Sequence, residues 1–201
     1  MKRISTDAEY LDSGKLVIDA DGVPFEPASK GYVDQRVPIT GTGSPERKVA
    51  APVGSVYVDA AATNGAIRWI KSSGAGSTGW RVEYGDTGWR DISASLVPGL
   101  IEINAGGHIQ VRRIGPFVEY SMKNFKVNTL GNLWQSPAGF GAEPGRDGQA
   151  VLPDGGTAHV TQYWLRIEGF TPGTNAAVYR AATVRFIADP VWPTTLPGTP
   201  A

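Results

Sequence analysis

The sequence contains no cysteine and only two histidines. Without cysteine there is no disulfide, no thiolate ligand for zinc and no thiol nucleophile, so the chain can fold in a reducing cytoplasm and persist outside a cell. Neither His108 nor His159 has a second histidine or a carboxylate at the sequence spacing of metal ligands. We therefore expect no metal, no cofactor and no catalytic residue, and two structural or solvated histidines.

An excess of charge of one sign is also lacking, because 19 Lys and Arg residues balance 19 Asp and Glu residues. Nucleic-acid binding requires a cationic surface, and Arg112-Arg113 is the only dense basic pair in the C-terminal half. We expect that pair to lie on a solvated strand face. No apolar run approaches the length of a membrane span, and the N-terminus is polar at once. The sequence predicts neither nucleic-acid binding nor membrane insertion. If the protein acts outside a cell, we expect it to leave by lysis or as part of a particle.

Glycine and proline are abundant, with 26 and 15 residues. Together they form about a fifth of the chain, against an average of roughly 12%. They follow no period, which excludes a collagen-type helix. Many short strands joined by tight turns suit this composition best, so the sequence predicts an all-β fold.

Residues 1–46 lack a core pattern and are predicted to be an attachment segment. Residues 16–24 favour a short strand closed by an Asp-Gly turn, and residues 40–45 favour a linker. Between them, Ser29 is a candidate cap for a short helix that ends before Pro38. So short a helix is unstable alone, so it would pack on copies of itself or on a neighbouring subunit.

Residues 47–95 are predicted to form a small β module rich in tryptophan and glycine. Residues 55–58 and 66–71 favour strands around a turn at Asn64-Gly65. A glycine turn that enters a strand opening with Trp-Arg then occurs twice. Large rings bury more area than aliphatic side chains and would supply most of this core. The three rings of the module are Trp69, Trp80 and Trp89.

Residues 96–189 alternate apolar and polar side chains and are predicted to form a jelly-roll-like β-sandwich head. The glycines of residues 104–107 favour a turn between two strands. The alternation slips by one residue between Met122 and Phe125, which indicates a β-bulge. Residues 190–201, with four prolines, are predicted to be an extended tail on a surface.

A loop-like stretch, residues 131–156, and the strand that follows residue 162 carry side chains suited to a ligand. Aromatic rings stack on sugar rings, and an arginine beside an aspartate hydrogen-bonds hydroxyls or phosphates. Packing in the core would explain each aromatic equally simply. The candidate ligand-binding residues are Trp134, Arg146, Asp147, Tyr163 and Trp164.

Motifs of catalysis and of ion binding are weak. Residues 74–79 have the glycine spacing of a dinucleotide loop, but they lead into a strand instead of a helix. Residues 19–22 resemble the start of a calcium loop without its distal glutamate. A glycan-cleaving enzyme needs two facing carboxylates, and we expect the available acids to be scattered over the surface. Those acids are Glu102, Glu119, Asp147, Asp154 and Glu168.

Five short motifs of this sequence are similar to motifs of a known protein family: residues 30–34, 51–57, 107–115, 136–140 and 192–198. Together with Thr-Gly-Trp at residues 78–80 and Trp-Ile-Lys at residues 69–71, they form islands scattered along most of the chain. In these motifs the chain resembles tail-fibre and minor tail proteins of bacteriophages, particularly those that infect actinobacteria.

The resemblance implies a homotrimer in the virion tail that is made in the host cytoplasm. The N-terminal part would bind other tail or baseplate proteins, and the β head would bind a cell-wall polysaccharide or teichoic-acid-like polymer without cleaving it. Three heads would multiply weak sugar contacts. A structural tail or capsid-decoration protein without a host ligand, and a polysaccharide depolymerase, are the alternatives.

Overall fold

A computed structural model of the chain describes residues 17–18, 24–25, 37–153, 155–169 and 180–201. The chain divides into two units, residues 1–37 and 38–201. In the first unit, β1 (Val17–Ile18) pairs antiparallel with β2 (Pro24–Phe25), which confirms the short strand predicted there. The predicted helix capped by Ser29 lies outside the described residues.

The second unit begins with a small four-stranded sheet. Its strands, in spatial order, are β3 (Ile39–Gly41), β4 (Val56–Asp59), β5 (Ala66–Lys71) and β6 (Trp80–Gly85). The pair β3–β4 is parallel and the other pairs are antiparallel. The predicted linker at residues 40–45 is therefore partly a strand, and the small sheet begins before the predicted boundary at residue 46. The three residues of β3 are too few to show a strand pattern in the sequence, and the partner strand β4 lies outside any local window.

Aromatic rings fill the core of the small sheet, as predicted, but one ring has a different origin. Trp69 and Trp80 are buried there, and Tyr57 contacts Trp80 edge-on. The third tryptophan is Trp192 from the C-terminal segment. The prediction of Trp89 as the third core ring is wrong, because that side chain is only half-buried and lies beside Arg112 instead.

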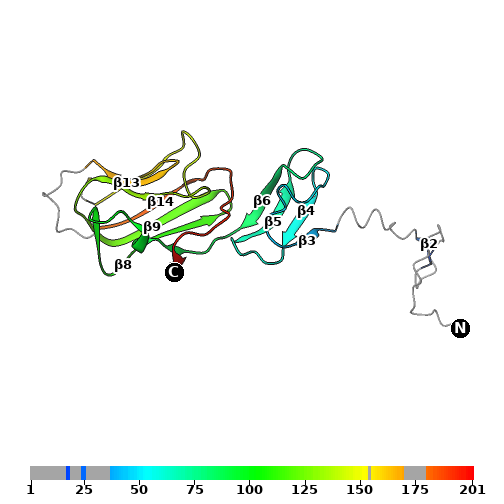
Figure 1. Cartoon of the computed structure of the whole chain (residues 1–201), viewed down its shortest axis with the longest axis horizontal. Coiled ribbons are helices and arrows are strands. Elements are labelled where there is room, and N and C mark those ends of the chain that lie inside the picture. The colour runs from blue at the N-terminus through cyan, green and yellow to red at the C-terminus, as the bar shows by residue number, and fades with distance from the viewer. Residues whose placement is uncertain (1–16, 19–23, 26–36, 154, 170–179) are drawn as a thin grey trace. The chain divides into compact units, whose positions relative to one another are not determined.

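The head consists of two further sheets (Figure 1). The five-stranded sheet has the order β14 (Arg180–Ile187), β9 (Phe117–Val127), β8 (Ile101–Ile114), β7 (Arg90–Asp91) and β15 (Thr199–Pro200). The four-stranded sheet has the order β10 (Gly131–Gln135), β13 (Trp164–Glu168), β12 (Thr157–Val160) and β11 (Gly148–Val151). A single 3-10 turn, η1 (Ser93–Ser95), connects β7 to the head's long hairpin. All these strand pairs are antiparallel, and the smaller sheet has Greek-key order.

One hydrophobic core lies between the two sheets of the head. Alternate residues of β9 and β14 point into it, and so do alternate residues of β12 and β13. At its centre, the Tyr120 ring stacks on Phe186 and meets Trp134 edge-on. Burial raises the pKa of Tyr120, whose hydroxyl hydrogen-bonds with Ser136 Oγ at 3.1 Å. The all-β prediction is confirmed, and two sheets around one core form a β-sandwich.

The long hairpin of β8 and β9 contains two irregularities. The predicted bulge is confirmed, because Asn124 has a positive φ and the pairing of β9 with β14 shifts beside it. The predicted turn at residues 104–107 is wrong, since this stretch lies inside β8 and only shifts its register against β9. A side chain at Gly107 would approach within 2.6 Å of the Asn124 carbonyl, so glycine permits this close crossing.

The C-terminal segment ties the small sheet to the head. The indole Nε1 of Trp192 donates to the Asn64 carbonyl at 3.0 Å, and Asn64 Nδ2 donates to the Pro193 carbonyl at 2.9 Å. At its end, β15 pairs with β7. The segment is thus not only an extended surface tail, as its prolines predict, because Trp192 is 7% exposed.

Arg112 and Arg113 both belong to this junction. Arg113 is buried, donates to the carbonyls of Gly139 (2.8 Å) and Val191, and lies 4.8 Å from the centre of the Trp192 ring. Burial lowers the pKa of Arg113 to about 10, against the opposing effect of Asp189, so the guanidinium remains charged at neutral pH. The prediction of a solvated basic pair is wrong for Arg113, since the carbonyls and the ring replace its water.

Its neighbour Arg112 forms a two-point ion pair with Asp86, directly after the small sheet ends. The hydrogen bonds from Arg112 hold the pKa of Asp86 below its usual range, although partial burial acts in the opposite direction. This pair places a charge-assisted contact at the point where the chain passes from the small sheet to the head.

No helix in the part of the chain that the structure describes is long and apolar enough to cross a membrane.

Candidate ligand-binding face

The four-stranded sheet of the head has one buried face and one face that is open to solvent. Leu165 and Ile167 of β13 point into the core, so the intervening residues Trp164, Arg166 and Glu168 point outward. The same alternation places His159 of β12 outward. We call this surface the outer face; its members are Asn132, Gln135, Gln149, His159, Trp164, Arg166 and Glu168.

Register aligns four polar side chains across the strands of this face. Arg166 is opposite Asn132 on one side and His159 on the other, and His159 is in turn opposite Gln149. Directly opposed residues have Cβ atoms about 4.5–5.5 Å apart and share one face of the sheet. These four residues therefore form a continuous polar line, which we call the outer row. Trp164 lies beside the row, opposite Gln135.

A chain of charged groups runs along the outer face through His159. Its Nε2 lies 2.9 Å from Asp147 Oδ2, and its Nδ1 lies 3.2 Å from Glu168 Oε2. Arg166 forms an ion pair with the other oxygen of Glu168. A neutral imidazole donates to only one carboxylate at a time, whereas an imidazolium donates to both. The cluster holds its own side chains in place, as a rigid recognition surface requires.

Four of the five predicted ligand-binding residues gather at one end of this sheet. Arg146 and Asp147 immediately precede β11, while Tyr163 and Trp164 lie at the start of β13. These strand ends are adjacent because Gly148 pairs with Val160, and Val160 pairs with Leu165. Tyr163 is 59% exposed, and Arg146 forms an exposed ion pair with Glu143 at 3.1 Å.

The fifth predicted residue, Trp134, does not lie on the outer face. It is 6% exposed and packs against Tyr120 in the core of the head. The pairing of β10 with β13 shifts between Asn132 and Trp134, so two successive residues, Leu133 and Trp134, both point inward. This bulge removes Trp134 from the set that can stack on a ligand.

The sequence interpretation missed His159, Arg166 and Glu168 as members of the face. The alternation of Trp164, Arg166 and Glu168 with apolar residues is visible in the sequence and would have found two of them. His159 had no such signal, because its carboxylate neighbours lie on two other segments and only register brings them together.

The described residues contain no group of three His, Cys, Asp or Glu side chains that could hold a metal ion. At His159 the geometry explains why the two neighbouring carboxylates do not form a metal site. Asp147 and Glu168 bind opposite nitrogens of one ring, so their oxygen lone pairs do not converge on one point. A cation site needs such convergence of several ligands.

The same geometry bears on glycan cleavage. Both carboxylates point at the imidazole, so its ring occupies the space where a glycosidic bond would lie between a catalytic pair. Of the other acids considered, Glu102 faces Lys126 and Glu119 faces Arg185. Asp154 lies outside the described residues.

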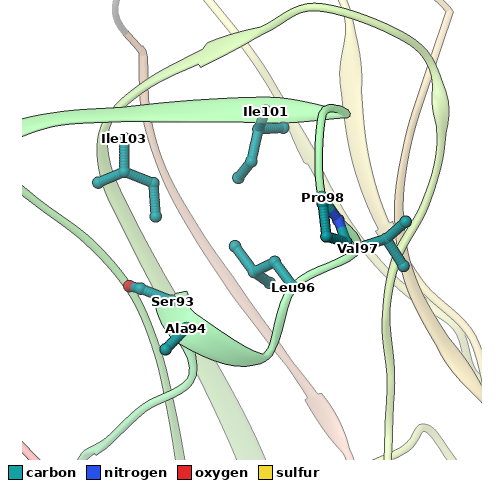
Figure 2. Close-up of a pocket in the computed structure, with 7 residues that line it drawn as sticks. All are labelled: Ser93, Ala94, Leu96, Val97, Pro98, Ile101 and Ile103. Carbon is teal, nitrogen blue, oxygen red and sulfur yellow. The ribbon is translucent and has the colours of Figure 1, made fainter.

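The head also has a pocket of about 400 Å³ beside η1, lined mostly by apolar side chains (Figure 2). Ile101 and Ile103 point from β8 toward Leu96 across this pocket, whereas Val97 points away. Ser93 is the single hydroxyl in the lining, and its Oγ already accepts the Ile109 N–H at 2.9 Å. The other lining side chains offer a polyhydroxylated ligand no hydrogen-bond partner, so the outer face suits a saccharide better.

Comparisons with protein-family models, with curated proteins and with solved structures find no match to this chain. The functional conclusion therefore depends on the fold, on the outer face and on the sequence motifs.

Proposed function

We propose that this chain is a bacteriophage tail protein, a tail fibre or receptor-binding tip, whose head binds a host cell-wall glycopolymer without cleaving it. The observation that carries the proposal is the outer face: aromatic and hydrogen-bonding side chains share an exposed sheet surface on a rigid sandwich. The motifs that resemble phage tail proteins supply the biological context.

The chemistry of the outer face matches what a sugar requires. A pyranose presents an apolar patch of C–H groups and a rim of hydroxyls. Trp164 and the exposed Tyr163 offer rings for the apolar patch. Asp147 and the amides of the outer row offer acceptors and donors for the hydroxyls. Because Trp164, Arg166 and His159 stand on strands, little entropy is lost when a ligand orders them.

A shallow face of this kind binds one sugar chain weakly. In the proposed homotrimer three heads engage the same wall, and linked weak sites reach avidities roughly 10²–10⁴ times higher than one site. The N-terminal part, residues 1–46, would hold the trimer and contact other tail or baseplate proteins. This arrangement explains how binding without a deep pocket suffices for attachment of a virion.

Absence of cleavage is part of the proposal. The imidazole between Asp147 and Glu168 supports it, because neither carboxylate faces the other across open space. The alternatives, a depolymerase and a structural tail or decoration protein, differ from the proposal in a measurable way.

The test is a sedimentation assay in which the full chain is mixed with insoluble cell-wall fractions from a panel of actinobacteria. We expect co-sedimentation with at least one fraction, loss of it in Trp164→Ala, and retention in the control Tyr84→Ala, whose exposed ring lies in β6 of the small sheet, away from the outer face. Light scattering of the same sample should give a trimer mass.

Two results would contradict the proposal. If the protein sediments with none of the fractions, a structural protein without a host ligand would be favoured. Release of reducing sugar ends, abolished in Asp147→Asn, would show a depolymerase.

A further inference from the structure

We infer that the outer row binds an uncharged oligosaccharide that lies across the strands, and that it discriminates against anionic wall polymers. This inference rests on the proposed function and narrows its ligand class.

The direction of the ligand follows from the register. The outer row crosses all four strands, from Asn132 on β10 to Gln149 on β11. Neighbouring strands are about 4.8 Å apart, so three steps span roughly 14 Å. Such a line contacts several sugar units at once. Both end residues are exposed amides, which donate and accept hydrogen bonds and so suit hydroxyls in either role.

The ligand's charge follows from the ion pairs. Arg166 is paired with Glu168, Arg146 is paired with Glu143, and His159 contacts two carboxylates. Three carboxylates accompany the two guanidiniums of this region, so each guanidinium already has a carboxylate partner. A polyphosphate or polyuronate chain would have to displace a carboxylate from its arginine and would meet Asp147.

The described residues also contain no α-helix whose N-terminus would bind a phosphate. An uncharged hydroxyl, by contrast, need not displace a carboxylate from its arginine. Asp147 contacts the imidazole through Oδ2, which leaves Oδ1 to accept a hydrogen bond from a sugar hydroxyl. Hydrogen bonds from a neutral donor to a charged acceptor are stronger than neutral pairs.

The experiment measures binding of the full chain to immobilised polymers by biolayer interferometry. The neutral probes are glucan, galactan, mannan and arabinan, each as disaccharide and hexasaccharide. The anionic probes are poly(glycerol phosphate) and polygalacturonate, at low and at high salt. The variants are Asn132→Ala and Gln149→Ala at the two ends of the row, with Tyr84→Ala as the control; thermal unfolding verifies that each is folded.

We expect at least one neutral hexasaccharide to bind more tightly than its disaccharide, and neither anionic polymer to bind. Each end variant should weaken hexasaccharide binding by about 2- to 10-fold, the equivalent of one lost hydrogen bond. The control should bind unchanged.

Three outcomes overturn the inference while the proposed function stands. One is binding of an anionic polymer that salt weakens, without binding of a neutral one. The second is neutral binding that neither end variant reduces. The third is binding to wall fractions with no binding to any neutral probe. Absence of binding to both wall fractions and probes overturns the proposed function itself.

Discussion

Replacement of Trp192 by alanine should unfold the small sheet while the head remains folded. The small core contains only six buried residues, and Trp192 is the one that comes from the far end of the chain. It fills space directly against Gly85, where an added Cβ would lie 2.6 Å from the ring. Removal of the ring leaves a cavity beside Gly85, in a small core whose other large side chains are rigid rings.

The magnitude follows from three losses. Truncation of a buried tryptophan to alanine costs about 3–5 kcal/mol, cavity included. The Asn64 carbonyl loses its donor, and Arg113 loses the ring beneath its charge, which adds on the order of 1 kcal/mol. The average stability per residue gives about 2–7 kcal/mol for the whole stretch from Ile39 to Gly85. The loss is therefore comparable to the whole free energy of unfolding expected for this sheet.

Hydrogen exchange followed by mass spectrometry is the assay, because it reports each strand separately. In Trp192→Ala we expect amides of β4, β5 and β6 to lose protection, whereas β9 and β14 keep most of theirs. In Trp192→Phe the protection of these amides should be intermediate between that of the unmodified chain and that of Trp192→Ala. The control is Val191→Ala, whose side chain is 54% exposed and whose removal should change nothing.

Unchanged protection in β4 to β6 would refute the role assigned to Trp192. An equal loss of amide protection in the small sheet and in the head would refute the claim that the head's own core is sufficient to keep the head folded.

Three further predictions concern other contacts. Because Arg112 lowers the pKa of Asp86 in the folded state, this ion pair stabilises the fold at pH values above the unfolded-state pKa of Asp86, and the stabilisation is lost as the pH falls through the folded-state pKa. Asp86→Asn should therefore lower the free energy of unfolding by about 1–2 kcal/mol at neutral pH and by much less in acid, as measured by urea unfolding at several pH values. Lys71 is buried and its Nζ donates to two loop carbonyls, at 2.7 Å in the case of Gly76, so Lys71→Met should cost about 2–4 kcal/mol in the same assay. Gly148→Ala would place a Cβ against the Phe186 ring, so we expect about 1–3 kcal/mol of destabilisation and weaker wall binding as Asp147 is displaced.

Much of the head could be predicted because its strands carry strict alternation. Val118, Tyr120 and Met122 are all buried, and the slip before Phe125 is the bulge that the structure shows. The candidate site was partly predictable for a related reason. Residue type alone selects Tyr163, Trp164 and Asp147 as suited to a sugar, and all three lie at one end of the same sheet.

Tertiary structure decided the features that depend on partners distant in sequence. β3 is a strand because β4 accepts it in parallel, and Trp192 is a core residue because Gly85 leaves room for its ring. Arg113 is buried because carbonyls from two other segments surround its charge. None of these partners is visible in a window of neighbouring residues.

The sequence by itself determined that the chain is built of strands, since composition and alternation act locally on each segment. It did not determine which faces meet or which side chains stand opposite one another. A shift of register by one residue exchanges the two faces of a strand, and only packing against the rest of the molecule selects the register. That selection turned Trp134 into the core and brought His159 between two carboxylates.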